Sequence, residues 1–233
     1  MRTQVGIIGA GPAGLLLGHL LRAEGIDCAV VERQTQARVV ERIRAGVLEQ
    51  TTTDLLHRLG IDERLNAGGL LHGRFALVDN GRVIRIDIAG LTGRQVTVYG
   101  QTEVTRDLIE AADERGLPIA WESPIQAIEG VDGDRPVIVY GDGERVDFDF
   151  VAGCDGFHGA ARQALPRHVR REFERVYPFG WLGVLADVPS CDDELIYASH
   201  ERGFALASMR SPTRSRYYIQ GAADERVEEW SDQ

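Results

Sequence analysis

A glycine-rich turn near the N-terminus constrains the fold more than any other part of the sequence. The segment Gly9-Ala10-Gly11-Pro12-Ala13-Gly14 follows a short apolar run, Thr3 to Ile8, and opens a helical pattern, Pro12 to Glu24. A second apolar run, Asp27 to Val31, then ends at Glu32. This order of strand, turn, helix and strand predicts the beginning of a Rossmann-type α/β fold.

Each glycine of this turn has its own part in a dinucleotide site. Gly9 permits the tight turn, Gly11 lets the backbone approach a pyrophosphate, and Gly14 lets the helix pack close to the sheet. The helix N-terminus offers free N–H groups and partial positive charge to phosphates. Glu32 can accept hydrogen bonds from ribose hydroxyls, which favours an adenosine ribose without a 2′-phosphate. The turn predicts an ADP-binding site but does not separate FAD from NAD.

Composition excludes several other classes of protein. The net charge of −10 argues against nucleic acid as a partner. Cys28, Cys154 and Cys191 form no C-x-x-C pair, which argues against disulfides and a zinc site and fits a reducing cytoplasm. No apolar run reaches the roughly 18 residues that a membrane span needs. We therefore expect a cytoplasmic protein with a small-molecule substrate, no metal and no membrane or nucleic-acid partner.

Further elements follow from periodicity and capping signals. Helices are expected over Gly46–Leu59 and Thr102–Arg115, the second with Thr102 as its N-cap. The stretch Gly73–Val98 alternates like a small antiparallel insertion. Short strands are expected at 125–131, 136–140 and 146–152, and two strands of another sheet at 204–209 and 214–220.

Five separated segments carry a family resemblance. They are Arg42–Gly46, Tyr99–Leu108, Ala152–Gly159, Tyr177–Gly183 and Arg210–Tyr218. In this order they resemble the p-hydroxybenzoate hydroxylases (4-hydroxybenzoate 3-monooxygenases), a family of FAD-dependent aromatic hydroxylases. The resemblance implies a Rossmann-type FAD-binding domain, residues 1–72 and 99–175, and a mixed β-sheet substrate domain, residues 73–98 and 176–233. Family members continue well beyond the equivalent of Gln233, so we expect a chain that is truncated at its C-terminus.

The resemblance also implies where the cofactors bind. Arg44 would pair with the FAD pyrophosphate, Gln101 would lie near the flavin, and Asp155 would bind the ribityl or pyrophosphate region. The full set expected to bind FAD is Gly9, Gly11, Gly14, Glu32, Arg42, Arg44, Gln101, Asp155 and Arg216. The set expected near NADPH is Arg33, Gln34, Arg38 and His158. Family members typically carry tyrosine where this chain has Arg38, so NADPH and NADH both stay open. By spacing alone, Arg42 and Arg44 fit solvated surface charges equally well.

A basic stretch near the C-terminal end suggests a site for an aromatic acid. Strand alternation puts Ser208 and Arg210 on one face, where a hydroxyl and a bidentate guanidinium can hold a carboxylate. The resemblance adds Tyr218 as a third ligand of the benzoate carboxylate. It also implies that Tyr197, the expected catalytic residue, faces the phenolic oxygen and helps to draw off its proton. Without the resemblance, a core tyrosine and a solvated strand face are equally good interpretations.

The activity implied by the resemblance is hydroxylation of 4-hydroxybenzoate to 3,4-dihydroxybenzoate with O2 and NADPH, through a flavin hydroperoxide. Homodimerisation is left open. One alternative is a catalytically inactive FAD- or nucleotide-binding fragment. Others are a sister hydroxylase of another phenolic acid and a nicotinamide dehydrogenase without flavin.

Overall fold

The computed structural model describes residues 3–42 and 46–226. The chain divides into two compact units, each discontinuous in sequence. The first unit comprises residues 1–45, 54–67 and 100–172, and the second comprises residues 46–53, 68–99 and 173–233. Residues 46–53 and 68–72 therefore belong to the same compact unit as residues 173–233, and not to the unit that contains residues 1–45. The assignment of one part to FAD and the other to substrate stays a prediction.

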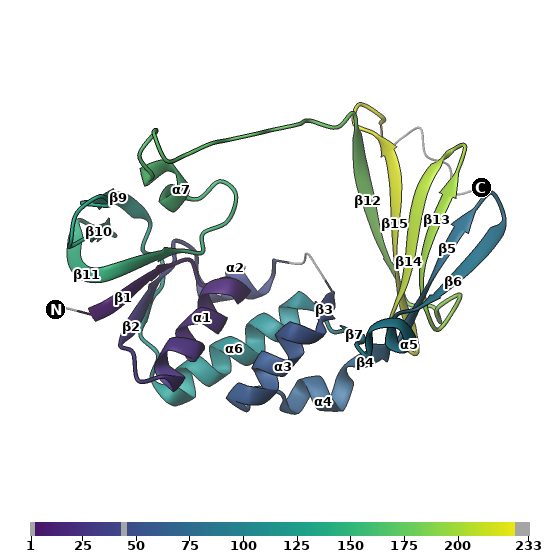
Figure 1. Ribbon diagram of the computed structural model, residues 1–233, viewed down its shortest axis with the longest axis horizontal. Coiled ribbons are helices and arrows are strands. Elements are labelled where there is room, and N and C mark those ends of the chain that lie inside the picture. Colours follow the sequence, from purple (N-terminus) through teal and green to yellow (C-terminus); the bar gives the residue numbers. More distant parts are fainter. Residues whose placement is uncertain (1–2, 43–45, 227–233) are drawn as a thin grey trace. The chain divides into compact units, whose positions relative to one another are not determined.

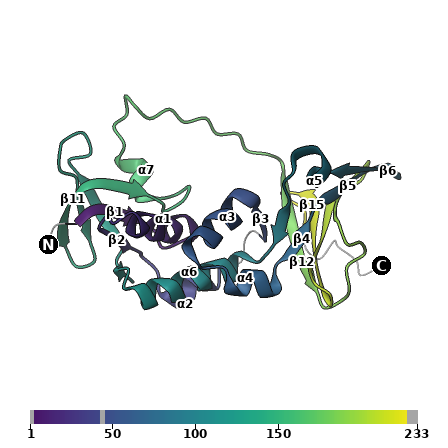
Figure 2. The same ribbon diagram turned by 60° about the horizontal axis from the view of Figure 1, so that its bottom comes forward.

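The first unit is built on a six-stranded sheet in the order β8-β2-β1-β11-β10-β9. Strands β8, β2, β1 and β11 run parallel to one another. Strand β10 pairs antiparallel with β11, and β9 pairs antiparallel with β10. Figures 1 and 2 both show β2, β1 and β11 side by side. The strands are β1 (Thr3–Ile8), β2 (Cys28–Val31), β8 (Ile119–Ala120), β9 (Ile125–Glu129), β10 (Val137–Tyr140) and β11 (Glu144–Gly153).

Helix α1 (Pro12–Ala23) leaves β1 through the glycine-rich turn and packs against α6 (Gln101–Arg115). His19 of α1 is buried there and donates from Nε2 to the Leu108 carbonyl at 2.8 Å. Ile7 and Leu15, both without solvent exposure, belong to the core of this unit. The shorter helices are α2 (Gln36–Val40), α3 (Gln50–Leu59), α4 (Glu63–Gly68) and α7 (Ala160–Ala164). The burial of β1 and the apolar face of α1 fixes the glycine-rich turn between them.

The second unit is built on a mixed six-stranded sheet in the order β12-β15-β14-β13-β5-β6, visible strand by strand in Figure 1. All neighbours are antiparallel except β13 and β5. The strands are β5 (Arg74–Asp79), β6 (Arg82–Asp87), β12 (Phe179–Ala186), β13 (Leu195–His200), β14 (Gly203–Ser211) and β15 (Arg214–Ala222). A smaller antiparallel sheet joins β3 (Val47–Glu49), β7 (Val96–Val98) and β4 (Leu70–His72), and α5 (Ile88–Thr92) follows β6.

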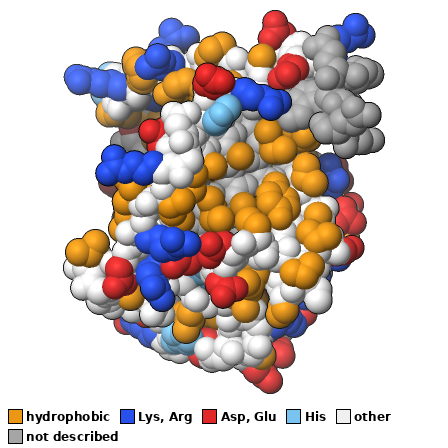
Figure 3. Space-filling model, turned by 90° about the vertical axis from the view of Figure 1, so that its right-hand side faces the viewer, with side chains coloured by type: hydrophobic (Ala, Val, Ile, Leu, Met, Phe, Trp, Pro, Cys, Tyr) orange, Lys and Arg blue, Asp and Glu red, His pale blue; other side chains and the backbone are white. Residues whose placement is uncertain are grey.

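Apolar side chains are exposed on the larger sheet of the second unit. Figure 3, which views this part of the chain, shows hydrophobic groups gathered over much of one face. The exposed large apolar residues on these strands, counting both faces of the sheet, are Leu77, Val83, Ile84, Trp181, Leu182, Val184 and Leu185. The described part of the chain contains no helix that is both long and apolar enough to cross a membrane.

The α/β fold class predicted from the sequence is confirmed, with a Rossmann-type sheet and a second, mixed sheet. Three local predictions are wrong. The expected helix Gly46–Leu59 begins only at Gln50, because Val47–Glu49 pairs with β7 as a strand. Short apolar runs fit either structure, and pairing decides between them. Thr102 does not cap α6, which begins at Gln101 after Gly100. The stretch Gly73–Val98 is not one antiparallel insertion, since β5 also pairs in parallel with β13 and β7 joins β3 and β4.

Candidate cofactor and aromatic-acid sites

A cavity of about 750 Å³ opens in the first unit where the parallel strands β1, β2 and β11 end. Segments from all three strand ends line it, together with the start of α1 and residues near α2 and α7. In open α/β sheets this edge is where ligands bind. The cavity is large enough for a sizeable organic ligand or cofactor.

The glycine-rich turn forms one wall of the cavity, and each of its three glycines has a different structural role there. Gly9 has φ of +102°, and a Cβ there would lie 2.7 Å from the Cys154 carbonyl oxygen. A Cβ on Gly14 would lie 1.9 Å from the Gly9 carbonyl oxygen, so the helix start and the strand end meet without room for a side chain. A Cβ on Gly11 would meet nothing within 4 Å. Gly11 therefore leaves open space exactly where a bound group could approach the backbone of α1.

Glu32 holds this wall to the end of β2. It is 8% exposed, and its Oε2 accepts a hydrogen bond from the Ala10 N–H at 2.8 Å. Its Oε1 accepts another from the Gln34 N–H at 2.9 Å. Each carboxylate oxygen retains capacity for a further donor. The side chain is thus fixed by the backbone and can still accept hydrogen bonds from ribose hydroxyls.

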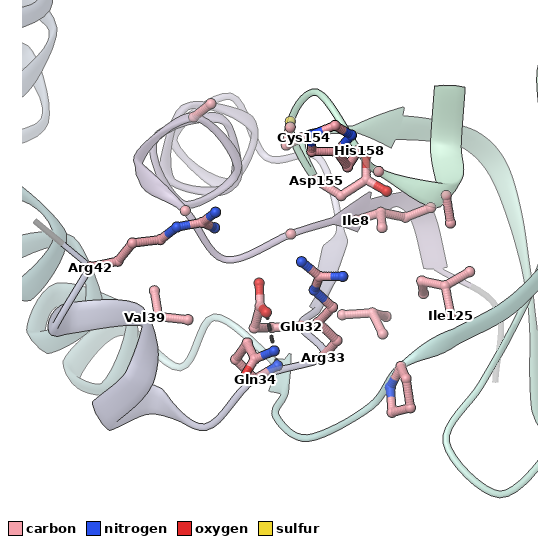
Figure 4. A pocket seen from close by; sticks show the side chains of 18 of the residues that line it. Ile8, Glu32, Arg33, Gln34, Val39, Arg42, Ile125, Cys154, Asp155 and His158 are labelled. Atoms are coloured by element: carbon pink, nitrogen blue, oxygen red, sulfur yellow. Dashed lines mark hydrogen bonds between the residues drawn. The ribbon is translucent and has the colours of Figure 1, made fainter. Parts of the chain in front are cut away.

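Basic side chains line the cavity around Glu32. Figure 4 shows the guanidinium groups of Arg33 and Arg42 directed into it on either side of Glu32. Arg38, on α2, also lines the cavity and lies 3.9 Å from Glu41 in an exposed ion pair. Among the described residues, Arg33 and Arg42 have no carboxylate within 4 Å. These exposed cations can meet an anionic ligand without first breaking an ion pair.

The loop after β11 completes the cavity. Asp155 lines it, and its Oδ2 accepts a hydrogen bond from the Ala161 N–H at 3.0 Å, at the start of α7. His158 lies nearby and is exposed. Burial, followed by the charge of Asp155, raises the pKa of the Cys154 thiol, so this cysteine stays protonated at neutral pH. Gln101, the first residue of α6, also lines the cavity.

One face of the larger sheet in the second unit gathers the other predicted residues. Ser208 on β14 lies opposite Arg216 on β15. Leu206 lies opposite both Tyr218 on β15 and Tyr197 on β13. Because paired residues point to the same side of a sheet, these five side chains share one face. The Ser208 hydroxyl lies 3.4 Å from the Arg216 carbonyl oxygen.

Arg216 on this face and Arg210 at the irregular end of β14 are two neighbouring arginines, one buried and one half-buried. Arg216 is 9% exposed, and its guanidinium carbon lies 4.4 Å from the centre of the Tyr218 ring. Burial, followed by repulsion from Arg216, lowers the pKa of Arg210. Among the described residues, neither arginine has a carboxylate within 4 Å. Buried cations are normally paired, so two adjacent unpaired ones mark a place for an anion.

Aromatic side chains extend the same face. Tyr197 contacts Phe75 edge-on, with ring centres 5.8 Å apart, and lies 6.3 Å from the ring of Phe204. Phe204 in turn contacts Trp181 at 5.4 Å. Such rings supply flat apolar surface beside the two arginines. The face therefore combines the elements that an aromatic carboxylate would require.

Comparisons with known proteins bear on the whole chain. The family model described as "FAD binding domain" matches residues 2–233. The chain belongs to the FAD-binding-domain family.

Relatives within the family include p-hydroxybenzoate hydroxylase of Acinetobacter baylyi, 52% identical over 235 residues. That match covers all of this chain and 58% of the relative. The 3-amino-4-hydroxybenzoate 2-monooxygenase of Streptomyces cremeus is 28% identical, over 72% of this chain and 43% of its own. The structure of p-nitrophenol 4-monooxygenase PnpA from Pseudomonas putida has a TM-score of 0.82 at 18% identity. It is matched over 98% of this chain and 60% of its own, and it supports the fold alone.

The cavity of this FAD-binding-domain protein fits the cofactor of its family. The open space at Gly11, the free N–H groups at the start of α1 and the orientation of Glu32 suit a pyrophosphate and a ribose. Volume and position agree with that use.

The predicted site residues fall into two groups. The cavity of the first unit is lined by Gly9, Gly11, Glu32, Arg33, Gln34, Arg38, Arg42, Gln101, Asp155 and His158. Gly14 does not line the cavity but packs against the Gly9 carbonyl in the glycine-rich turn. Arg44 lies outside the described residues. Arg216, predicted among the FAD residues, belongs to the second unit with Tyr197, Ser208, Arg210 and Tyr218.

Two further residues of the second unit have notable surroundings that the sequence does not predict. His72 is 4% exposed, its Nδ1 has no hydrogen-bond partner, and Asp193 and Glu194 lie close enough to influence its pKa. Gly46 is buried against Arg210. No local pattern marks either one, because their neighbours come from distant strands.

Proposed function

We propose that this chain forms the FAD-binding part and much of the substrate-binding part of a flavoprotein monooxygenase that converts 4-hydroxybenzoate to 3,4-dihydroxybenzoate. The chain spans 58% of the length of the Acinetobacter relative, and the name of that hydroxylase supports the substrate. The observation that carries the proposal is the pair Arg210 and Arg216, two neighbouring cations beside an aromatic sheet face that have no carboxylate within 4 Å among the described residues.

The substrate carboxylate is assigned to Arg210, with Ser208 and Tyr218 as further donors. A guanidinium can bind a carboxylate through two parallel hydrogen bonds, and burial strengthens that interaction. The rings near Tyr197 supply the apolar surface for the benzene ring. Tyr197 is assigned to the phenolic oxygen of the substrate. Its hydroxyl oxygen would accept a hydrogen bond from the substrate O–H and help to remove that proton. A phenolate ring is the better nucleophile.

FAD is assigned to the cavity of the first unit. Gly11 and the start of α1 would face the pyrophosphate, and Glu32 would bind the ribose. Arg42, Arg44, Gln101, Asp155 and Arg216 remain proposed FAD contacts. When bound, FAD takes a hydride from the nicotinamide cofactor and, with O2, supplies the oxygen that is transferred.

The nicotinamide cofactor is assigned to the basic rim of the same cavity. Arg33 and Arg38 are exposed there and can pair with a 2′-phosphate, which favours NADPH over NADH. Gln34 and His158 are the other proposed contacts. A cytoplasmic location remains a prediction from the cysteine content, and homodimerisation stays open.

The proposal is tested on the 233-residue chain in two steps. Flavin uptake is followed by the visible spectrum after addition of FAD, and 4-hydroxybenzoate binding is followed by calorimetric titration. Substrate-dependent NADPH oxidation and product are then measured. A chain that takes up no FAD would contradict the cofactor assignment. If the flavin-loaded chain binds 4-hydroxybenzoate no more tightly than phenol, which lacks the carboxylate, the assignment of Arg210 is overturned.

A further inference from the structure

The backbone of Gly46 lies against the guanidinium of Arg210. Gly46 immediately precedes β3, is buried, and is 164 positions from Arg210 in the sequence. Its carbonyl oxygen accepts hydrogen bonds from the Tyr99 N–H at 3.0 Å and from Nη1 of Arg210 at 2.9 Å. All three residues belong to the second unit. The carbonyl thus joins the start of β3, the end of β7 and the end of β14.

Glycine is needed at position 46 for space and not for backbone conformation. Its φ does not lie in the left-handed region. A Cβ there would lie 1.4 Å from Nη1, 2.1 Å from Cζ and 2.2 Å from Nη2 of Arg210. These are the atoms at the far end of a flexible side chain. The guanidinium can move away, so a methyl group would displace it without requiring the backbone to shift.

We propose that Gly46 is a positioning residue for recognition of the carboxylate: its carbonyl and its missing side chain together set where the Arg210 guanidinium lies. The inference rests on the proposed function, in which Arg210 binds the substrate carboxylate. One N–H of the guanidinium bonds to Gly46, and the others remain to form a bidentate pair with a carboxylate. Strand β14 has an irregular register between Met209 and Ser211, so regular strand pairing does not fix the Arg210 side chain.

The test is the substitution Gly46→Ala in the full chain supplied with FAD. We expect the Kd for 4-hydroxybenzoate to rise by about 30-fold, since one methyl group displaces a desolvated charge partner. The Kd for the uncharged analogue 4-hydroxybenzamide should change by less than about twofold, because it makes no ion pair. A general disturbance of the fold would weaken both ligands alike.

Two further variants isolate the path through Arg210. Gly180→Ala adds the same methyl group in β12 of the same sheet, where it meets nothing within 4 Å, and should leave both affinities unchanged. In an Arg210→Ala background, Gly46→Ala should have no further effect on 4-hydroxybenzoate affinity, which is the signature of coupled residues.

The outcomes separate this inference from the proposed function. If the unaltered chain does not distinguish 4-hydroxybenzoate from its amide, the proposed function fails and the inference with it. If the unaltered chain does so and Gly46→Ala preserves the distinction, only the inference is overturned. Equal losses for the acid and the amide, or additive losses with Arg210→Ala, would also overturn it.

Discussion

The two units build their sites from different materials. In the first, the cavity wall is made of backbone: a turn with a left-handed Gly9, a helix start that contacts a strand end at Gly14, and N–H groups that fix Glu32. In the second, the site is a sheet face whose side chains come from three strands, with Arg210 positioned through the Gly46 carbonyl.

This difference predicts opposite responses to substitution. A backbone site is inseparable from the fold, so altering it changes the unfolding free energy together with binding. The site on the sheet face contains desolvated arginines that have no carboxylate partner among the described residues, so altering it should change binding much more than stability. Each substitution below tests that distinction.

The largest effect is expected for Gly14→Ala in the first unit. The new Cβ would overlap the Gly9 carbonyl oxygen, and neither backbone segment can move without disrupting β1 or α1. We expect a loss of about 3 kcal/mol or more in unfolding free energy, measured by urea denaturation, and loss of FAD uptake.

Gly11→Ala is the matched control for that substitution. Its Cβ meets nothing within 4 Å, so the unfolding free energy should change by less than about 1 kcal/mol. FAD affinity should still fall, by about 100-fold, because the methyl group occupies the approach to the pyrophosphate. Equal stability losses in the two variants would show that the turn is not built as the structure indicates.

Arg210→Ala should give the next largest effect, and only on binding. Removing a desolvated charge partner should weaken 4-hydroxybenzoate by about 100-fold in calorimetric titration. The unfolding free energy should stay within about 1 kcal/mol of its original value, because the Gly46 carbonyl keeps its bond from Tyr99 and repulsion from Arg216 is relieved. Arg202→Ala, an exposed arginine in the turn before β14, is the control. A large loss of stability in Arg210→Ala would break the proposed contrast between the units.

The same contrast explains what the sequence could predict. The cavity wall made by the glycine-rich turn and Glu32 is predictable because strand, turn, helix and Glu32 lie within about 30 residues of one another. Gln101 and Asp155 line the same cavity from distant segments, and only the family resemblance points to them. The two strands that carry Ser208 and Arg216 are predictable from pattern, but the register that sets these residues opposite each other is not. Gly46 falls in a predicted helix, and nothing local reveals that Arg210 occupies the space beside it. Packing between distant segments leaves no periodic pattern.

Glu32→Gln should have a smaller effect, and one that combines stability with binding. The amide cannot offer both oxygens to Ala10 and Gln34, so one backbone N–H loses its partner. We expect about 1 kcal/mol less unfolding free energy and about tenfold weaker FAD binding, measured by denaturation and by fluorescence titration. A loss of FAD affinity with unchanged stability would mean that Glu32 serves the ribose alone and does not hold the turn.

The smallest expected effect is on how the unfolding free energy depends on pH. Burial lowers the pKa of His19 in the first unit, and the charges of Arg115 and Arg22 add to this, against its hydrogen bond to Leu108. The unfolded chain takes up this proton near pH 6.5, but the folded chain only at lower pH. Stability is therefore complete above that range and falls with acid, by at most about 1.4 kcal/mol per pH unit.

His19→Gln removes this proton site and should flatten the decline of the urea midpoint between about pH 6.5 and 5. His168→Gln, exposed in the same unit, should leave the decline unchanged. Burial also lowers the pKa of His72 in the second unit, against the charges of Asp193 and Glu194, so His72→Gln measures how much that unit adds to the decline. If His72→Gln has the larger effect, the acid sensitivity belongs to the sheet of the second unit, and the backbone-built unit is the more tolerant of the two.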